Sequence, residues 1–170
     1  MPEMPTLDTL FATLPQRGEV TWLGLRPARR AALHAVQMVV ADPEQGLVGD
    51  HYNGRSGNRQ VTLIQAEHLA VIASCLGLQS IAPEALRRNI VVSGINLLAL
   101  KDKIIRVGEE LEVTGLCQPC SLMEQTLGAG GYNAVRGHGG ITAKVRRAGN
   151  IAVGDPVHYP ESLAVGTITQ

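Results

Sequence analysis

A cysteine that follows a proline is the residue of this chain best placed to do chemistry. Cys120 comes after Gln118 and Pro119, and residues 120–127 have the apolar spacing of a short helix that ends at Gly128. Proline restricts its own φ angle and favours an extended residue before it, so the chain is expected to break between a strand and this helix. A cysteine at a helix N-terminus lies at the positive end of the helix dipole, which favours the thiolate that attacks electrophiles or binds metals.

A glycine-rich segment, residues 128–140, follows this cysteine and is expected to form a loop. It contains Asn133, Arg136 and His138, and glycines flank the histidine on both sides, which allows a ligand to approach closely. The alternative for Cys120 is a structural role, because unpaired cysteines are often buried and pack like small apolar residues. Both interpretations, a reactive thiol beside a ligand and a buried thiol, stay open at this point.

The charged residues are unevenly distributed, although the 15 basic and 15 acidic residues give a formal net charge of zero. Three segments contain basic residues and no Asp or Glu: residues 51–66 with Arg55 and Arg59, residues 85–101 with Arg87, Arg88 and Lys101, and residues 125–150 with Arg136, Lys144, Arg146 and Arg147. Guanidinium groups and glycine-rich backbone both suit phosphate, so these segments are candidates to converge on one anionic small molecule. The alternative is that each arginine lies on a solvated strand face.

The chain resembles the MOSC domain family, named after the C-terminal domain of molybdenum cofactor sulfurase. Six ordered stretches carry the resemblance: residues 46–51 (GLVGDH), 87–94 (RRNIVVSG), 107–109 (VGE), 118–123 (QPCSLM), 136–141 (RGHGGI) and 153–155 (VGD). The resemblance implies a β-barrel in which the cysteine at position 120 is the functional thiol. That thiol would carry sulfur as a persulfide or bind molybdenum of a pterin cofactor. The chain departs from many relatives in having Arg87 and Arg88 before Asn89, and Leu116, Cys117 and Gln118 before the Pro-Cys pair.

From this resemblance and the basic segments we predict a molybdenum cofactor site beside Cys120, with the cysteine also as the ligand of molybdenum. The predicted contacts to the cofactor are Arg55, Arg88, Asn89, Asn133, Arg136, His138 and Lys144. The predicted function is to bind this cofactor, to carry sulfur as a persulfide on Cys120, or both. The alternatives are a molybdenum-dependent oxidoreductase acting on N-hydroxylated substrates and a non-catalytic cofactor-binding or docking module. Expected partners are molybdopterin, a small sulfur donor or acceptor, and a cysteine desulfurase or reductase. Pyridoxal phosphate would enter only through such a separate desulfurase domain or partner.

Composition and turn signals indicate a mainly β protein. Hydrophobic residues make up 45% of the chain but aromatic residues only 3%, which predicts an aliphatic core and gives little support for base stacking on nucleic acid. Many short apolar runs separated by glycine turns favour a closed or nearly closed β-barrel with a few short peripheral α-helices. We expect an N-terminal tail over residues 1–18, the barrel over residues 19–160 and a C-terminal tail over residues 161–170, with one continuous strand over residues 33–40.

The other cysteines and histidines are weaker candidates. Cys117 and Cys120 form a C-x-x-C pair, but one such pair is poor support for zinc, and redox chemistry of this motif is best known in α/β proteins. Cys75, His34 and His68 fit structural or solvated positions, while His51 fits a loop that lines a site. No apolar run is long enough for a membrane span and the N-terminus lacks the features of a secretory signal. A reducing cytoplasm is therefore the expected location for these cysteines.

Overall fold

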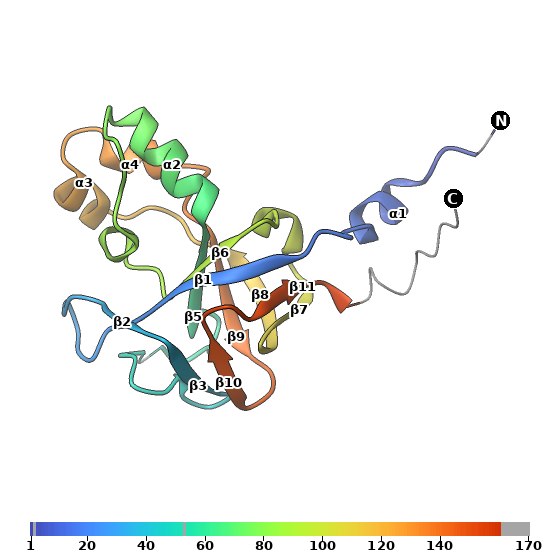
Figure 1. Ribbon diagram of the computed structural model, residues 1–170, viewed down its shortest axis with the longest axis horizontal. Helices are drawn as coiled ribbons and strands as arrows, with labels where there is room; N and C mark the ends of the chain where they lie inside the picture. Colours follow the sequence, from blue (N-terminus) through green and yellow to red (C-terminus); the bar gives the residue numbers. More distant parts are fainter. Residues whose placement is uncertain (2, 53, 161–170) are drawn as a thin grey trace.

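Short strands dominate the computed structural model, which describes residues 1, 3–52 and 54–160 (Figure 1). The strands are β1 Gly18–Leu25, β2 His34–Val36, β3 Met38–Asp42, β4 Gly46–Leu47, β5 Val61–Gln65, β6 Ile90–Ser93, β7 Ile104–Val107, β8 Glu109–Leu116, β9 Ile141–Val145, β10 Gly149–Ala152 and β11 Pro156–His158. The helices are α1 Leu7–Ala12, α2 Ala66–Cys75, α3 Ser121–Leu127 and α4 Gly131–Val135, with 3₁₀ helices η1 Pro83–Leu86 and η2 Leu97–Leu100.

Seven of these strands form a closed barrel. Their order is β11-β7-β8-β9-β5-β6-β1, and the ring is closed by antiparallel pairing of β1 with β11, where Gly18 lies opposite Val157. Strands β5 and β6 are parallel, and the other neighbours in the ring are antiparallel. Closure leaves no unpaired edge in the ring. The predicted mainly β fold, a closed barrel with short helices, is confirmed.

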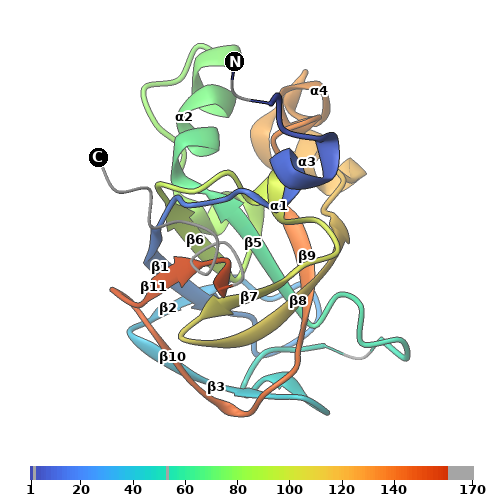
Figure 2. The same ribbon diagram turned by 90° about the vertical axis from the view of Figure 1, so that its right-hand side faces the viewer.

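The barrel is packed with aliphatic side chains on the inside and carries a second apolar cluster on the outside. Val61 and Leu63 of β5 belong to the interior cluster, whereas Ile64 belongs to the outer one. The outer cluster joins β5 and β6 to α2, α3, α4 and η1 through residues such as Ile72 and Met123. The three helices α2, α3 and α4 accordingly lie together against one side of the barrel (Figures 1 and 2). Strand β5 is therefore buried on both faces.

Three local expectations differ from the structure. The strand expected over residues 33–40 is divided at Gln37, because β2 pairs with β1 while β3 pairs with β10 in a separate three-stranded sheet. The glycine-rich segment contains helix α4, whose N-terminal amides at Gly130 and Tyr132 donate to the carboxylate of Glu124 at 2.7 and 2.8 Å. The segment expected to be an N-terminal tail contains α1, which buries none of its residues.

Two further expectations concern the C-terminal residues and membrane spans. The expected C-terminal tail over residues 161–170 lies outside the described residues. Within the part of the chain that the structure describes, no helix combines the length and the apolar character needed to cross a bilayer.

Candidate active site

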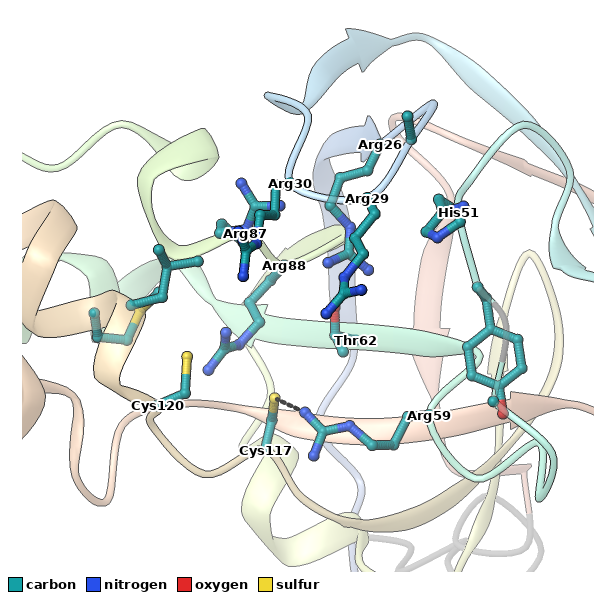
Figure 3. Close-up of a pocket in the computed structure, with 15 residues that line it drawn as sticks. Arg26, Arg29, Arg30, His51, Arg59, Thr62, Arg87, Arg88, Cys117 and Cys120 are labelled. Carbon is teal, nitrogen blue, oxygen red and sulfur yellow. Dashed lines mark hydrogen bonds between the residues drawn. The ribbon is translucent and has the colours of Figure 1, made fainter.

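A cavity of about 620 Å³ lies on the outer wall of the barrel, next to the outer apolar cluster (Figure 3). Its floor includes Thr62 of β5, whose neighbours Val61 and Leu63 point into the barrel, because successive side chains of a strand face opposite sides. Its walls come from residues 26–30 after β1, residues 51–52 and 54–59 before β5, residues 87–88 before β6 and residues 117–123 around the start of α3. The volume is in the range of small-molecule and cofactor sites.

The cavity is strongly basic. It is lined by His51 and six arginines: Arg26, Arg29, Arg30, Arg59, Arg87 and Arg88. Among the described residues that line it there is no Asp or Glu. Asp50, beside the cavity, accepts a hydrogen bond from the backbone N–H of Arg26 at 2.7 Å and forms an ion pair with its guanidinium at 3.7 Å. Most of the positive charge is therefore available to an anionic ligand.

Arg88 is the most constrained of these arginines, with only 6% of its surface exposed. Its Nε donates to the carbonyl oxygen of Gly139 at 2.8 Å, and its Nη1 donates to that of Leu86 at 2.7 Å. Its Nη2 is buried and has no hydrogen-bond partner among the described residues. Such unpaired buried donors are rare in proteins, so this nitrogen is well suited to an acceptor atom of a ligand.

The electrostatic surroundings of Arg88 include both cysteines of the C-x-x-C pair. Burial is the main cause that lowers the pKa of Arg88, and the nearby charges of Arg59 and Arg26 lower it further. Negative charge on Cys117 and Cys120 acts in the opposite direction and raises it. Arginine remains protonated in proteins, so Arg88 is a buried cation whose electrostatic neighbours include both cysteines.

The two thiols lie on the same wall of the cavity but differ in accessibility. Cys120 is exposed and occupies the N-cap position of α3, whereas Cys117 has 3% of its surface exposed. The side chains of both point toward the cavity, with the guanidinium of Arg88 between them in the view of Figure 3. Nη2 of Arg59 donates to Sγ of Cys117 at 3.8 Å. The interpretation of Cys120 as a buried structural thiol is therefore wrong.

Two glycines of the predicted loop bring the backbone against Cys117. The amide of Cys117 donates to the carbonyl oxygen of Gly140 at 2.9 Å. A Cβ atom at Gly139 would overlap the carbonyl oxygen of Cys117, and one at Gly140, where φ is +85°, would overlap the carbonyl oxygen of Leu63. Only glycine permits both close approaches. The glycine-rich segment thus contributes to the site through its backbone.

Of the seven residues predicted to contact the cofactor, Arg88 lines the cavity, as does the predicted functional thiol of Cys120. The other six predicted contacts do not line it. Asn89 is buried below the cavity, where Oδ1 accepts from the amide and hydroxyl of Thr62 and Nδ2 donates to the carbonyl of Gly24. Lys144 pairs with Glu112 at 3.6 Å. Arg55 is exposed in the segment before β5 and does not line the cavity.

The three predicted contacts from the glycine-rich segment also lie outside the cavity lining. Arg136 donates to Oδ1 of the exposed Asn133 at 3.3 Å. The ring of His138 meets that of His68 edge-on, with 5.4 Å between the centroids, and its Nδ1 is 3.1 Å from the carbonyl oxygen of Ala134. These side chains therefore interact with the helices beside the barrel.

Sequence analysis missed the arginines that follow β1. Arg26, Arg29 and Arg30 line the cavity, but their segment is absent from the basic segments that the sequence analysis selected. Residues 20–41 contain no Asp or Glu, so the criterion used for the other basic segments would have identified them. His51, which was expected to line a site, does line the cavity.

Comparison with known proteins supports the family suggested by the motifs. The model of the MOSC domain matches residues 39–158, which is more than half of the chain and includes most of the cavity. The chain belongs to the MOSC family. This family is associated with molybdenum cofactor proteins. No curated protein matches the sequence of the chain.

Solved structures share the fold at low sequence identity. The MOSC chain is similar to the YUAD protein (APC1665) from Bacillus subtilis, with a TM-score of 0.73 and 21% identity over 85% of this chain and 97% of that one. It is also similar to YiiM from Escherichia coli, with a TM-score of 0.63 and 19% identity over 82% of this chain and 68% of that one. YiiM from Geobacillus stearothermophilus gives a TM-score of 0.65 and 16% identity over 82% and 73% of the two chains.

Proposed function

We propose that this MOSC protein binds the molybdenum cofactor in the arginine-lined cavity, with the thiol of Cys120 facing the metal. The observation that carries the proposal is the buried guanidinium of Arg88, whose Nη2 lacks a partner among the described residues and which lies near both thiols. A buried cation without a carboxylate partner is costly unless an anion completes it. A phosphorylated, sulfur-rich ligand has the charge that such a site requires.

The residues of the cavity suit different parts of this cofactor. Arg59, Arg87 and the arginines of residues 26–30 are suited to the phosphate, because guanidinium groups bind phosphate oxygens in a bidentate manner. The thiolate of Cys120 is a soft ligand of the kind that suits molybdenum already bound to pterin sulfur atoms. When bound, the cofactor would supply redox chemistry that amino acids lack, while the protein binds and orients it.

The described residues do not form a complete metal site by themselves. Among the described residues no group of three or more His, Cys, Asp or Glu side chains could hold a metal ion. A metal beside Cys120 must therefore arrive with most of its own ligands, as it does in a pterin cofactor. This requirement favours the cofactor over a free divalent ion.

Metal analysis tests the proposal directly. Protein purified from cells that make the cofactor should contain stoichiometric molybdenum and pterin, and Cys120→Ser should lose most of the molybdenum. Cys75→Ser is the matched control, because Cys75 is an exposed cysteine on α2 that does not line the cavity. Loaded protein can then be assayed for reduction of N-hydroxylated substrates. Wild-type protein that contains neither molybdenum nor pterin would contradict cofactor binding.

The exposure of Cys120 favours a second function, the transport of sulfur as a persulfide. An exposed thiol at the cavity mouth can react with a sulfur donor on another protein or in solution. Intact mass recorded immediately after incubation with a cysteine desulfurase and cysteine should then show one added sulfur atom on the wild type and on Cys75→Ser, and none on Cys120→Ser. If neither metal nor sulfur binds, the remaining function is that of a non-catalytic docking module.

A further inference from the structure

We propose that Cys117 is a second reactive thiol of this site and that it discharges a persulfide carried on Cys120, with release of sulfide and formation of a Cys117–Cys120 disulfide. The inference rests on the proposed role of Cys120 as a sulfur carrier. That role by itself gives Cys117 no function. Yet Cys117 is a free cysteine, lines the same cavity as Cys120 and lies only three positions before it.

The local structure places this pair where a reactive C-x-x-C motif can work. Strand β8 ends at Leu116, Cys117 follows directly, and Cys120 precedes the first residue of α3. The pair therefore lies between a strand and a helix, although the whole fold is a β-barrel. Only Gln118 and Pro119 separate the two cysteines, and neither belongs to a strand or helix. A disulfide needs α-carbons about 4.4–6.8 Å apart, which a bent loop of two intervening residues allows.

The two thiols differ in exposure, and this difference indicates that Cys120 receives sulfur before Cys117 reacts. Cys120 is exposed, so an external sulfur donor reaches it first. Cys117 is almost fully buried and is held by the Arg59 contact to its sulfur and by the hydrogen bond from its amide to Gly140. A donor in solution therefore has little access to Cys117, whereas a group attached to Cys120 shares the cavity with it.

The step balances without an added oxidant. The Cys117 thiolate attacks Sγ of persulfidated Cys120, a sulfur–sulfur bond forms between the two cysteines, and the bond from Sγ to the outer sulfur breaks. The outer sulfur takes the electron pair, is reduced to sulfide and leaves as hydrosulfide, while the sulfur of Cys117 is oxidised to the disulfide level. The attack follows the ordinary course of thiol–disulfide exchange. A cellular dithiol reductant would restore both thiols for another cycle.

The arginines suit the movement of negative charge in this step. Charge begins on Cys117 and ends on the departing hydrosulfide. Arg59 donates a hydrogen bond to the sulfur of Cys117. Arg88 interacts electrostatically with both cysteines, and its Nη2 has no hydrogen-bond partner among the described residues. Charge-assisted donors fixed near developing anions stabilise them more than water does in a confined site.

The test follows one sulfur atom on the intact protein without oxygen. Fully reduced wild type, Cys117→Ser, Cys117→Ala, Cys120→Ser and Cys75→Ser each receive one equivalent of inorganic polysulfide and are desalted at once. Intact mass and trapped sulfide are then followed with time. Two substitutions of Cys117 are included because the residue is buried, and thermal unfolding checks that each variant folds.

In the wild type and in Cys75→Ser, the sulfur adduct should give way to protein that has lost two hydrogen atoms, with one sulfide released per chain. Both Cys117 variants should keep the adduct at least about tenfold longer, because an attached thiol acts at millimolar or higher effective concentration. A wild-type adduct that is as long-lived as that of Cys117→Ala would overturn the inference and leave sulfur transport intact. The absence of an adduct on Cys120 even in Cys117→Ala would instead overturn sulfur transport, and the inference with it.

Discussion

Nε of Arg88 donates a hydrogen bond of 2.8 Å to the carbonyl oxygen of Gly139, which is 51 positions further along the chain. The α-carbon of the same glycine packs against the carbonyl of Cys117 so closely that no side chain fits there. One backbone position therefore contacts both a buried guanidinium and the backbone of Cys117. The position of Arg88 and that of Cys117 depend on each other through Gly139.

Replacement of Arg88 by Met should weaken both folding and anion binding. The change leaves the carbonyl oxygens of Gly139 and Leu86 without their donors, which should lower the free energy of unfolding by about 2–4 kcal/mol. Urea denaturation measures this loss. Arg147→Met, at an exposed arginine outside the cavity lining, should change stability by less than about 0.5 kcal/mol. Equal stability of the two variants would show that the bonds of Arg88 contribute little.

Exposed arginines of the cavity should contribute to affinity with little effect on stability. With inorganic pyrophosphate as a probe, Arg59→Met and Arg29→Met should each weaken binding by about threefold to tenfold, measured by calorimetry. Added salt should weaken binding to the wild type, because ions screen exposed charges. Lys144→Met is the control, since Lys144 pairs with Glu112 and does not line the cavity. Loss of binding in Lys144→Met with no change in Arg59→Met would place the anion elsewhere.

Asn89 and Asn133 were both predicted to contact the cofactor, and the structure gives them different environments. Asn89→Ala should lower the free energy of unfolding by about 2–4 kcal/mol, because it leaves buried groups of Thr62 and Gly24 without partners. Asn133→Ala, at an exposed position, should cost less than about 0.5 kcal/mol. Denaturant unfolding of the two variants provides the comparison. A stable Asn89→Ala protein that fails to bind the cofactor would instead support the contact predicted from sequence.

The environment of His68 should make the protein less stable at mildly acidic pH. Burial, and then the charge of His138, lower the pKa of His68 below 6.5, and Glu67 opposes them. The unfolded chain therefore binds a proton at higher pH than the folded chain does. Stability is unaffected by this group well above pH 6.5 and falls as the pH drops through the unfolded pKa toward the folded one.

Thermal unfolding at about pH 7.5 and about pH 5.5 tests this linkage. His68→Gln should lose less stability on acidification than the wild type. His34→Gln serves as the control, because His34 is exposed on β2. The proposed role of His68 would fail if its replacement left the pH dependence of the unfolding temperature unchanged.

The barrel could be predicted from the sequence because its signals are local. Short aliphatic runs between glycine turns correspond to most of the observed strands, and the short helix expected over residues 120–127 appears as α3. The break at Gln37 could not be predicted in this way, since it arises where β2 and β3 join different partners. Pairing between distant strands is not encoded in the periodicity of either strand alone.

The site was predicted in part for a related reason. Cys120, Arg88 and His51 line the cavity as the motifs suggested. Lys144 lies in a segment of sequence without acids, but the register of β8 and β9 places Glu112 directly opposite it. The distribution of charge along the sequence therefore identified segments rich in basic residues. Which of these residues are free to bind an anionic ligand depends on whether the neighbouring strand places an acidic side chain opposite them.

The five residues of strand β5 contribute both to the packed interior of the barrel and to the ligand cavity on its outer wall. Val61 and Leu63 belong to the packed interior, while Thr62 forms part of the floor of a cavity whose charged walls are all loops. Substitutions inside the barrel should change its melting temperature without changing its ligand. Exchange of residues 26–30 or 51–59 should alter the preferred ligand on an unaltered scaffold. Sequence drift in these loops would then let members of such a fold diverge in chemistry while their barrels stay superimposable.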